Sequence, residues 1–146
     1  MDKNKILLVL FVVFVGIFFQ ASCGKEQIED EIPYIYVNFE INPNSIAYGN
    51  LNIPGNWTYV TGGYKGIILY HTAVQGEYLA FERACPHDPL EEESQLTVED
   101  NYTIISCSIC GSRYLILDGS RFDGPAVRSL KKYQTHFDGT YLHVSN

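Results

Sequence analysis

The apolar residues of this chain fall into short runs, and this pattern constrains the fold more than any other feature. Tyr, Val, Ile, Thr and Phe dominate the runs, and Gly, Pro or Asn interrupts them at short intervals. Beyond residue 22, no long stretch has the period of an amphipathic helix, so the pattern predicts an all-β domain. The predicted strands span 34–41, 45–51, 57–60, 66–73, 77–84, 102–107, 113–118, 130–137 and 140–144.

Two tight hairpins are predicted between neighbouring strands. The residues "VQGE" join a strand that ends at Ala73 to one that starts at Glu77, and "DGT" at 138–140 joins the last two strands. An Asp-Gly pair between two apolar runs is a strong hairpin signal.

The N-terminus has the features of a signal peptide. Two lysines precede an apolar run over 6–19, which is short for a membrane-spanning helix, and two small residues then precede Cys23. This order resembles a bacterial lipobox, although Gln20 stands where an aliphatic residue is usual. We predict a signal peptide over 1–22, a lipid on Cys23 and an acidic tether over 23–33, with an uncleaved anchor helix as the alternative. The protein would then lie in the cell envelope, anchored to the membrane on its periplasmic side or at the cell surface.

The charge of the chain disfavours one class of partner. The 146-residue chain has a formal charge of −7, and removal of residues 1–22 leaves 8 basic and 16 acidic side chains, a formal charge of −8. No basic surface remains to hold a polyanion, so the sequence disfavours nucleic-acid binding. The remaining length suits one domain, predicted over 34–146.

Three cysteines and one histidine form the candidate site. They are arranged as Cys85-x-His87 and Cys107-x-x-Cys110, each pair following a predicted strand. With Cys23 assigned to the lipid, an odd number of thiols remains, so they cannot all pair in disulfides within one chain. Four such ligands suit a tetrahedral Zn²⁺ ion or a [2Fe–2S] cluster.

At these residues the sequence resembles the Rieske family, whose pattern is Cys-x-His and Cys-x-x-His. "YLAFERACPH" resembles the family's strand into the first ligand loop, and "GSRY" after Cys110 resembles the Gly-Ser-x-Tyr of respiratory Rieske proteins. "FDGPAVRSLKKYQTHFDGTYLHV" resembles the covering Gly-Pro-Ala loop and the closing hairpin. The resemblance spans about residues 64 to 144. It implies stacked antiparallel sheets with the ligand loops in a small subdomain, about 83–118.

The resemblance also implies the role of each site residue. Cys85 and Cys107 would bind one iron of a [2Fe–2S] cluster, and His87 and Cys110 the other, with Cys110 standing where the family has its second His. The Ser112 and Tyr114 hydroxyls match those that donate hydrogen bonds to the cluster's sulfurs. A third thiolate makes the centre more negative, so its reduction potential should lie between those of ordinary Rieske and all-Cys clusters.

The implied function is electron transfer to or from a redox partner protein, with the protein as a carrier or accessory subunit and not a complete enzyme. Three alternatives stay open at this point. They are a structural Cys₃His zinc site, a Cys107–Cys110 disulfide with Cys85 free, and a Rieske-type fold that binds nothing. The three other histidines are more simply strand residues than ligands, namely His71, His136 and His143.

Overall fold

A computed structural model of the chain describes residues 31–146, so the predicted signal peptide, Cys23 and most of the tether lie outside the described residues. Ten strands and one short helix make up the described part. They are β1 (Asn38–Ile41), η1 (Ile46–Asn52), β2 (Trp57–Val60), β3 (Ile67–His71), β4 (Tyr78–Glu82), β5 (Thr97–Val98), β6 (Ile104–Ser106), β7 (Arg113–Leu115), β8 (Arg121–Asp123), β9 (Lys132–Phe137) and β10 (Leu142–Ser145). Over residues 31–146, no helix is long and apolar enough to cross a membrane.

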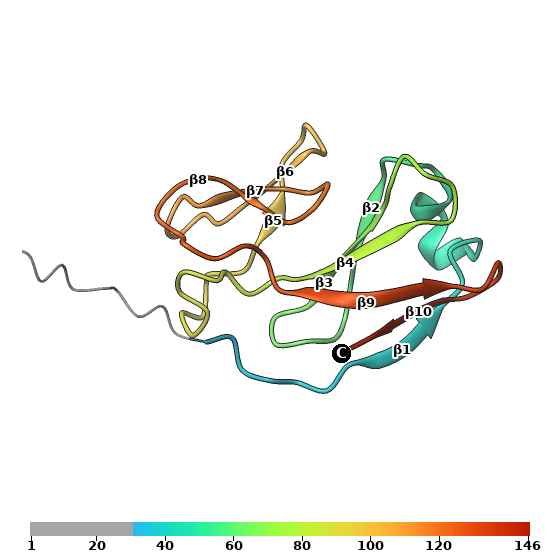
Figure 1. Cartoon of the computed structure of the whole chain (residues 1–146), viewed down its shortest axis with the longest axis horizontal. Coiled ribbons are helices and arrows are strands. Elements are labelled where there is room, and N and C mark those ends of the chain that lie inside the picture. The colour runs from blue at the N-terminus through green and yellow to red at the C-terminus, as the bar shows by residue number, and fades with distance from the viewer. Residues whose placement is uncertain (1–30) are drawn as a thin grey trace, which may run out of the picture.

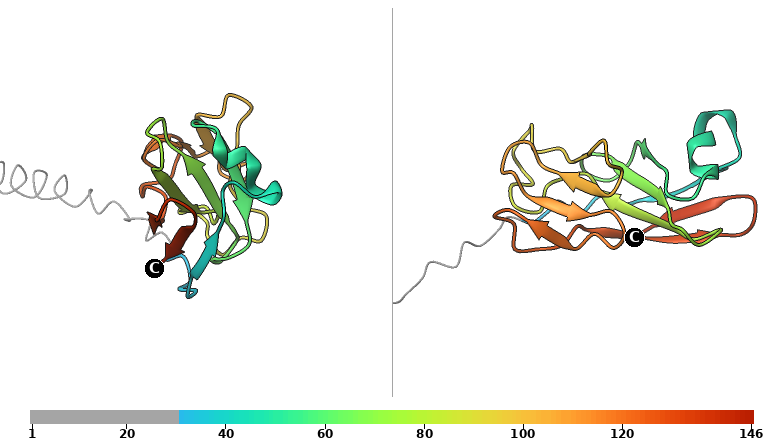
Figure 2. Two further views of the ribbon diagram at one scale, coloured as in Figure 1. Left: turned by 90° about the vertical axis from the view of Figure 1, so that its right-hand side faces the viewer. Right: turned by 90° about the horizontal axis from the view of Figure 1, so that it is seen from above.

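Two antiparallel sheets confirm the all-β prediction. The larger has the strand order β1-β10-β9-β4-β3-β2 and curls into a half-barrel, and the smaller has the order β5-β6-β7-β8. The small sheet occupies one end of an elongated body, whereas η1 and the tip of the β9–β10 hairpin lie at the other end (Figure 1 and Figure 2). Both predicted hairpins are confirmed, because β3 pairs with β4 and β9 pairs with β10.

Every residue of β3 and β4 is buried, because each strand faces a separate core on either side. On one side, Ile68 and Phe81 join the core that reaches into the small sheet. On the other side, Ile67 and Ala80 join the core inside the curled sheet. The two strands therefore form a buried layer between the two cores.

The prediction of a strand over 45–51 is wrong, because this segment is the 3-10 helix η1. A turn precedes it: the Ser45 hydroxyl donates to Asn42 O at 2.8 Å, and the Tyr48 N–H then donates to Ser45 O at 3.1 Å. Ile46 is fully exposed, and only Leu51 of this helix is buried. The alternation that predicted a strand therefore does not correspond to a buried face.

Candidate metal centre

The first ligand loop leaves the end of β4 and is closed by main-chain hydrogen bonds at its base. The Cys85 N–H donates to Ser94 O at 3.1 Å, and the Leu96 N–H donates to Arg83 O at 2.7 Å. Ala84 forms an isolated bridge with Gln95. This closure keeps Cys85 completely buried, although it lies in a loop.

A buried carboxylate anchors this loop to the body of the protein. Glu82 Oε1 accepts the N–H groups of Lys65 at 2.9 Å and Ala84 at 3.0 Å. Its Oε2 accepts the Tyr64 N–H and the Tyr133 hydroxyl, both at 2.7 Å. Four donors thus satisfy a charge with no solvent exposure, as a buried carboxylate requires.

The second ligand loop is the tight connection between β6 and β7. The Cys107 N–H donates to Ser112 O and the Gly111 N–H donates to Cys107 O, both at 2.9 Å. Gly111 has a φ of 75°, a left-handed conformation that glycine adopts without strain. The turn reverses the chain within the Cys-x-x-Cys segment and directs Cys107 and Cys110 toward the first loop.

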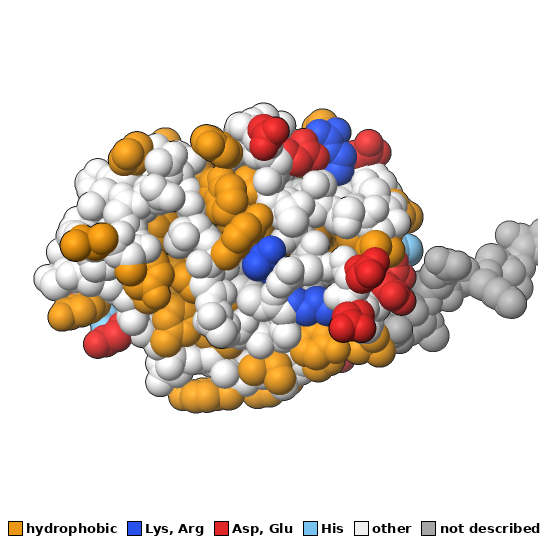
Figure 3. Space-filling model, turned by 180° about the vertical axis from the view of Figure 1, so that it is seen from behind, with side chains coloured by type: hydrophobic (Ala, Val, Ile, Leu, Met, Phe, Trp, Pro, Cys, Tyr) orange, Lys and Arg blue, Asp and Glu red, His pale blue; other side chains and the backbone are white. Residues whose placement is uncertain are grey.

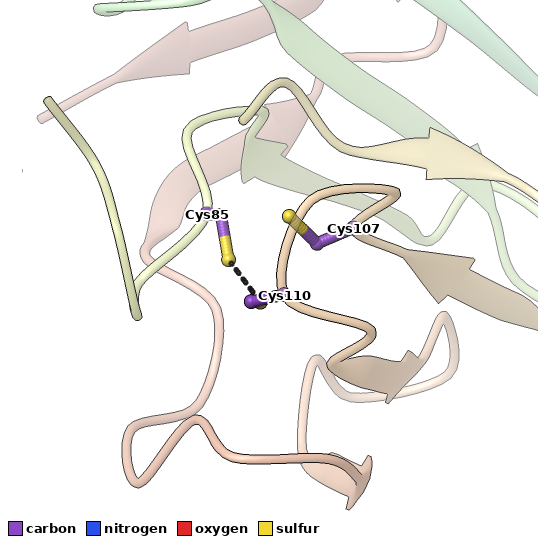
Figure 4. Close-up of side chains that lie close together, drawn as sticks. All are labelled: Cys85, Cys107 and Cys110. Carbon is purple, nitrogen blue, oxygen red and sulfur yellow. Dashed lines mark hydrogen bonds between the residues drawn. The ribbon is translucent and has the colours of Figure 1, made fainter. Parts of the chain in front are cut away.

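The structure brings the three predicted cysteines together at the meeting point of these loops. The sulfurs of Cys85, Cys107 and Cys110 all lie within 4.8 Å of one another, and Cys85 Sγ is 3.5 Å from Cys110 Sγ (Figure 4). All three are free thiols, so no Cys107–Cys110 disulfide is present. Cys85 and Cys107 are buried, and Cys110 is half-buried.

The environment favours negative charge on Cys107 over Cys85. A hydrogen bond from Cys85, together with the N–H groups of Cys110 and Ile109, lowers the pKa of the Cys107 thiol to about 5. The same hydrogen bond, with burial, raises the pKa of Cys85. At neutral pH the pair therefore carries one thiolate, which is the form that binds a metal.

The hydroxyls of Ser112 and Tyr114 lie beside two of the sulfurs. The Cys110 thiol donates to Ser112 Oγ at 3.1 Å, and the Tyr114 hydroxyl lies 3.9 Å from Cys85 Sγ. Burial and then the neighbouring Cys85 raise the pKa of Tyr114, so its hydroxyl keeps its proton at neutral pH. A Cys110 thiolate has no proton to donate. In that state the Ser112 hydroxyl becomes the donor and the Cys110 sulfur the acceptor.

A third loop packs on the second one. The Ala126 N–H donates to Ser112 Oγ at 3.0 Å, which links residues 124–126 to the hydroxyl beside Cys110. A Cβ on Gly124 would lie 2.5 Å from Ser112 Cα, so only glycine fits at this close approach. Ser112 therefore connects the sulfur of Cys110 to the loop at 124–126.

His87 occupies a different position from the three cysteines. Its ring is partly exposed, its Nε2 lies 3.8 Å from Asp88 Oδ2, and it is not part of the three-sulfur group. His87 follows Cys85 by two residues in the same loop. Three thiols together with an imidazole in the first loop form a donor set whose chemistry fits either an iron–sulfur cluster or zinc.

Sequence reasoning did not identify Glu82 or Ala126 as part of the site's support. Glu82 lies in an apolar strand, where alternation assigns a carboxylate to a solvent-facing position. The N–H groups that satisfy it come partly from residues far away in the chain. The resemblance of the Gly-Pro-Ala segment to the family's covering loop could have identified Ala126 as a residue close to the site.

Comparisons with known proteins support the fold. No protein-family model matches the chain, and no curated protein matches it. The crystal structure of the cyanobacterial plasma-membrane Rieske protein PetC3 from Synechocystis PCC 6803 is similar with a TM-score of 0.55 and 16% identity, over 77% of this chain and 100% of that chain. The ferredoxin of carbazole 1,9a-dioxygenase from Nocardioides aromaticivorans IC177 aligns with a TM-score of 0.43 and 16% identity, over 63% of this chain and 86% of that chain. At 16% identity, the likeness to the PetC3 structure shows a Rieske-type fold and nothing more.

Proposed function

We propose that this protein is an electron-transfer protein that holds a Rieske-like [2Fe–2S] cluster through Cys85, His87, Cys107 and Cys110. One observation carries the proposal: two loops at the end of a Rieske-type fold bring three free thiols within 4.8 Å of one another. The hydroxyls of Ser112 and Tyr114 lie beside two of those sulfurs. Hydroxyl groups beside the sulfurs can donate hydrogen bonds that stabilise a centre whose sulfurs become more negative on reduction.

A bound cluster would supply one-electron transfer, and the chain's own residues would set its environment. Burial of Cys85 and Cys107 keeps water from their sulfurs, and the low pKa of Cys107 prepares one thiolate before any metal arrives. His87 and Cys110 are the more exposed donors, so that side of the centre would face a redox partner protein. The hydroxyls of Ser112 and Tyr114 would stabilise the reduced, more negative form of the centre. The negative charge of the third thiolate, Cys110, would destabilise that form.

A single Zn²⁺ ion is the second candidate, and the spacing of the sulfurs favours it. In the cluster assignment, Cys85 and Cys110 bind different irons, yet their sulfurs are only 3.5 Å apart. Two thiolates on one tetrahedral zinc, each at about 2.3 Å, are separated by about 3.8 Å. With His87 as fourth ligand, the protein would be a structural or binding module with a Cys₃His zinc site.

The proposal also includes an anchor at the membrane. A signal peptide over 1–22 and a lipid on Cys23 would place the folded domain in the cell envelope, with residues 23–33 as the tether. A carrier held in this way meets its partner in two dimensions at the membrane. Mass spectrometry of the mature protein tests this part directly, because a lipidated N-terminal Cys23 has a defined mass increment and a Cys23→Ala variant must lose it.

Metal and sulfide analysis separates the two candidates. Protein purified without oxygen should be coloured and contain two irons and two acid-labile sulfides, and dithionite should produce the paramagnetic signal of a reduced [2Fe–2S] cluster. A colourless protein with one zinc and no iron, even after attempted cluster reconstitution, would contradict the electron-transfer proposal and support the zinc site. The matched control is Cys85→Ser, which should lose either metal because it removes a buried ligand.

A further inference from the structure

Two histidines and a glutamate, which are residue types able to bind metals, lie on neighbouring strands at the end of the molecule away from the cysteines (Figure 1). Strand register pairs Glu40 of β1 with His143 of β10, and His143 with His136 of β9. Residues directly opposite each other in neighbouring strands point to the same face, so these three side chains form one row across the sheet. The two imidazole rings lie 6.0 Å apart between centroids and are nearly parallel.

The orientation of His143 is fixed by Asp138 in the hairpin turn. His143 Nε2 lies 3.3 Å from Asp138 Oδ2, and because a carboxylate only accepts, the ring nitrogen must donate. Asp138 is itself fixed, since its Oδ1 accepts the N–H groups of Thr140 at 2.8 Å and Tyr141 at 2.7 Å. A carboxylate that accepts from the non-ligating nitrogen is the usual support of a metal-binding histidine.

The other nitrogen of His143 then faces a second carboxylate. Nδ1 lies 3.5 Å from Glu40 Oε2. If the ring carries a proton on Nε2 alone, both atoms are acceptors, so a cation between them, either a proton on Nδ1 or a metal ion, makes the contact favourable. Nitrogen and oxygen ligands at about 2.1 Å on a tetrahedral zinc are about 3.4 Å apart, close to the observed separation.

We propose that Glu40, His143 and His136 form a second, surface site for a divalent transition-metal ion of the zinc type. His143 Nδ1 and the Glu40 carboxylate bind the ion, His136 supplies the third ligand from the neighbouring strand, and Asp138 orients His143 without touching the metal. Two imidazoles and a carboxylate with remaining open positions match the ligand set of exchangeable zinc sites. From the sequence alone, His136 and His143 are ordinary strand residues. The strand register places them opposite each other, so that both can take part in one site.

Zinc titration of the full chain under reducing conditions tests the site. Wild-type protein should bind one more Zn²⁺ than the His143→Ala and His136→Ala variants, because the cysteine centre contributes equally in all three. Gln134→Ala is the matched control, since Gln134 is an exposed residue of the same strand, two positions before His136, and it should retain the extra ion. Asp138→Asn keeps an oxygen for the turn's N–H groups but removes the charge, and should weaken this binding by about 10- to 100-fold.

Ring resonances of the two histidines provide a readout that the cysteine centre does not affect. Zinc should shift the side-chain signals of His136 and His143 together, and saturate both at the same concentration. Equal zinc stoichiometry in wild-type and His143→Ala protein would overturn the proposal. Ring signals that respond to pH alone would also overturn it, because a proton would then be the cation between His143 and Glu40.

Discussion

The Tyr133 hydroxyl donates to Glu82 Oε2 at 2.7 Å inside the protein, and this contact ties β9 to the base of the first ligand loop. Glu82 is followed after two residues by Cys85, so the contact stabilises the backbone that carries a site cysteine. Burial and then Glu82 raise the pKa of Tyr133, which therefore remains a donor at neutral pH.

Removal of this donor should destabilise the protein. Tyr133→Phe leaves the buried carboxylate with three donors, and we expect a loss of about 1–3 kcal/mol in the free energy of unfolding, measured by urea denaturation. Glu82→Gln should lower the free energy of unfolding further, because the NH₂ group of the glutamine would face N–H donors instead of accepting from them. Tyr141→Phe, at an exposed tyrosine, is the control and should change little. Equal stability of Tyr133→Phe and wild type would show that the contact contributes nothing.

Stability should fall in alkaline solution. Burial raises the pKa of Tyr114 and of Tyr133 above the ordinary value near 10. The unfolded chain then releases these protons at a lower pH than the folded protein does, so the free energy of unfolding is constant below about pH 9 and decreases as pH rises through 10 and beyond. Urea denaturation at pH 8 and pH 11 measures the decrease, which should be smaller for the Tyr114→Phe/Tyr133→Phe double variant than for wild type.

Local sequence patterns predicted most of the fold, and the errors have physical causes. The apolar runs over 66–73 and 77–84 contain β3 and β4, because strands buried on both faces are apolar at consecutive positions. Strand β8 was missed, since all three of its residues are exposed and it is held only by pairing with β7. The run over 45–51 has the right alternation for a strand, but a turn at Asn42 starts a 3-10 helix instead.

The sequence identified the three cysteines that lie together in the structure, but it did not identify the residues that support them. Cys-x-His and Cys-x-x-Cys are short spacings within single loops, so they can be recognised directly in the sequence. The role of Glu82 depends on donors from Tyr64 and Tyr133, which only the folded chain brings to it. The same holds for the row of Glu40, His143 and His136, because strand register is not visible in the spacing of its members.

Loss of the Ser112 hydroxyl should lower the reduction potential of a bound cluster. Ser112 Oγ is 3.1 Å from Cys110 Sγ, and a donor there favours the more negative, reduced form. We expect Ser112→Ala to lower the potential by on the order of 60 mV, which is a tenfold change for one electron. Voltammetry of the loaded protein measures this, with Ser108→Ala, an exposed serine in the same loop, as control. If the Ser112→Ala potential equals that of wild type, the Ser112 hydroxyl does not influence the reduction potential of the centre.

Replacement of Cys110 by histidine should raise the potential. The change exchanges one thiolate for a neutral imidazole, so the centre carries one negative charge less and accepts an electron more easily. We expect the wild-type potential to lie between about −400 mV and −150 mV, and the Cys110→His potential to exceed it. The two potentials are compared by redox titration at one pH. If they coincide, Cys110 is not a ligand of the cluster.

Gly124 should be essential for the contact between the covering loop and the second ligand loop. Its φ is +94°, and a Cβ would lie 2.5 Å from Ser112 Cα and 2.9 Å from Gly111 O, which are backbone atoms that cannot move aside freely. Gly139 is a matched control, because its φ is +99° while nothing lies within 4 Å of its Cβ position. Gly139→Ala should therefore show only the cost of the left-handed backbone, about 1–3 kcal/mol. Gly124→Ala should lower the free energy of unfolding further and speed the release of bound metal to a chelator. If both variants release metal at the wild-type rate, the covering loop does not protect the centre.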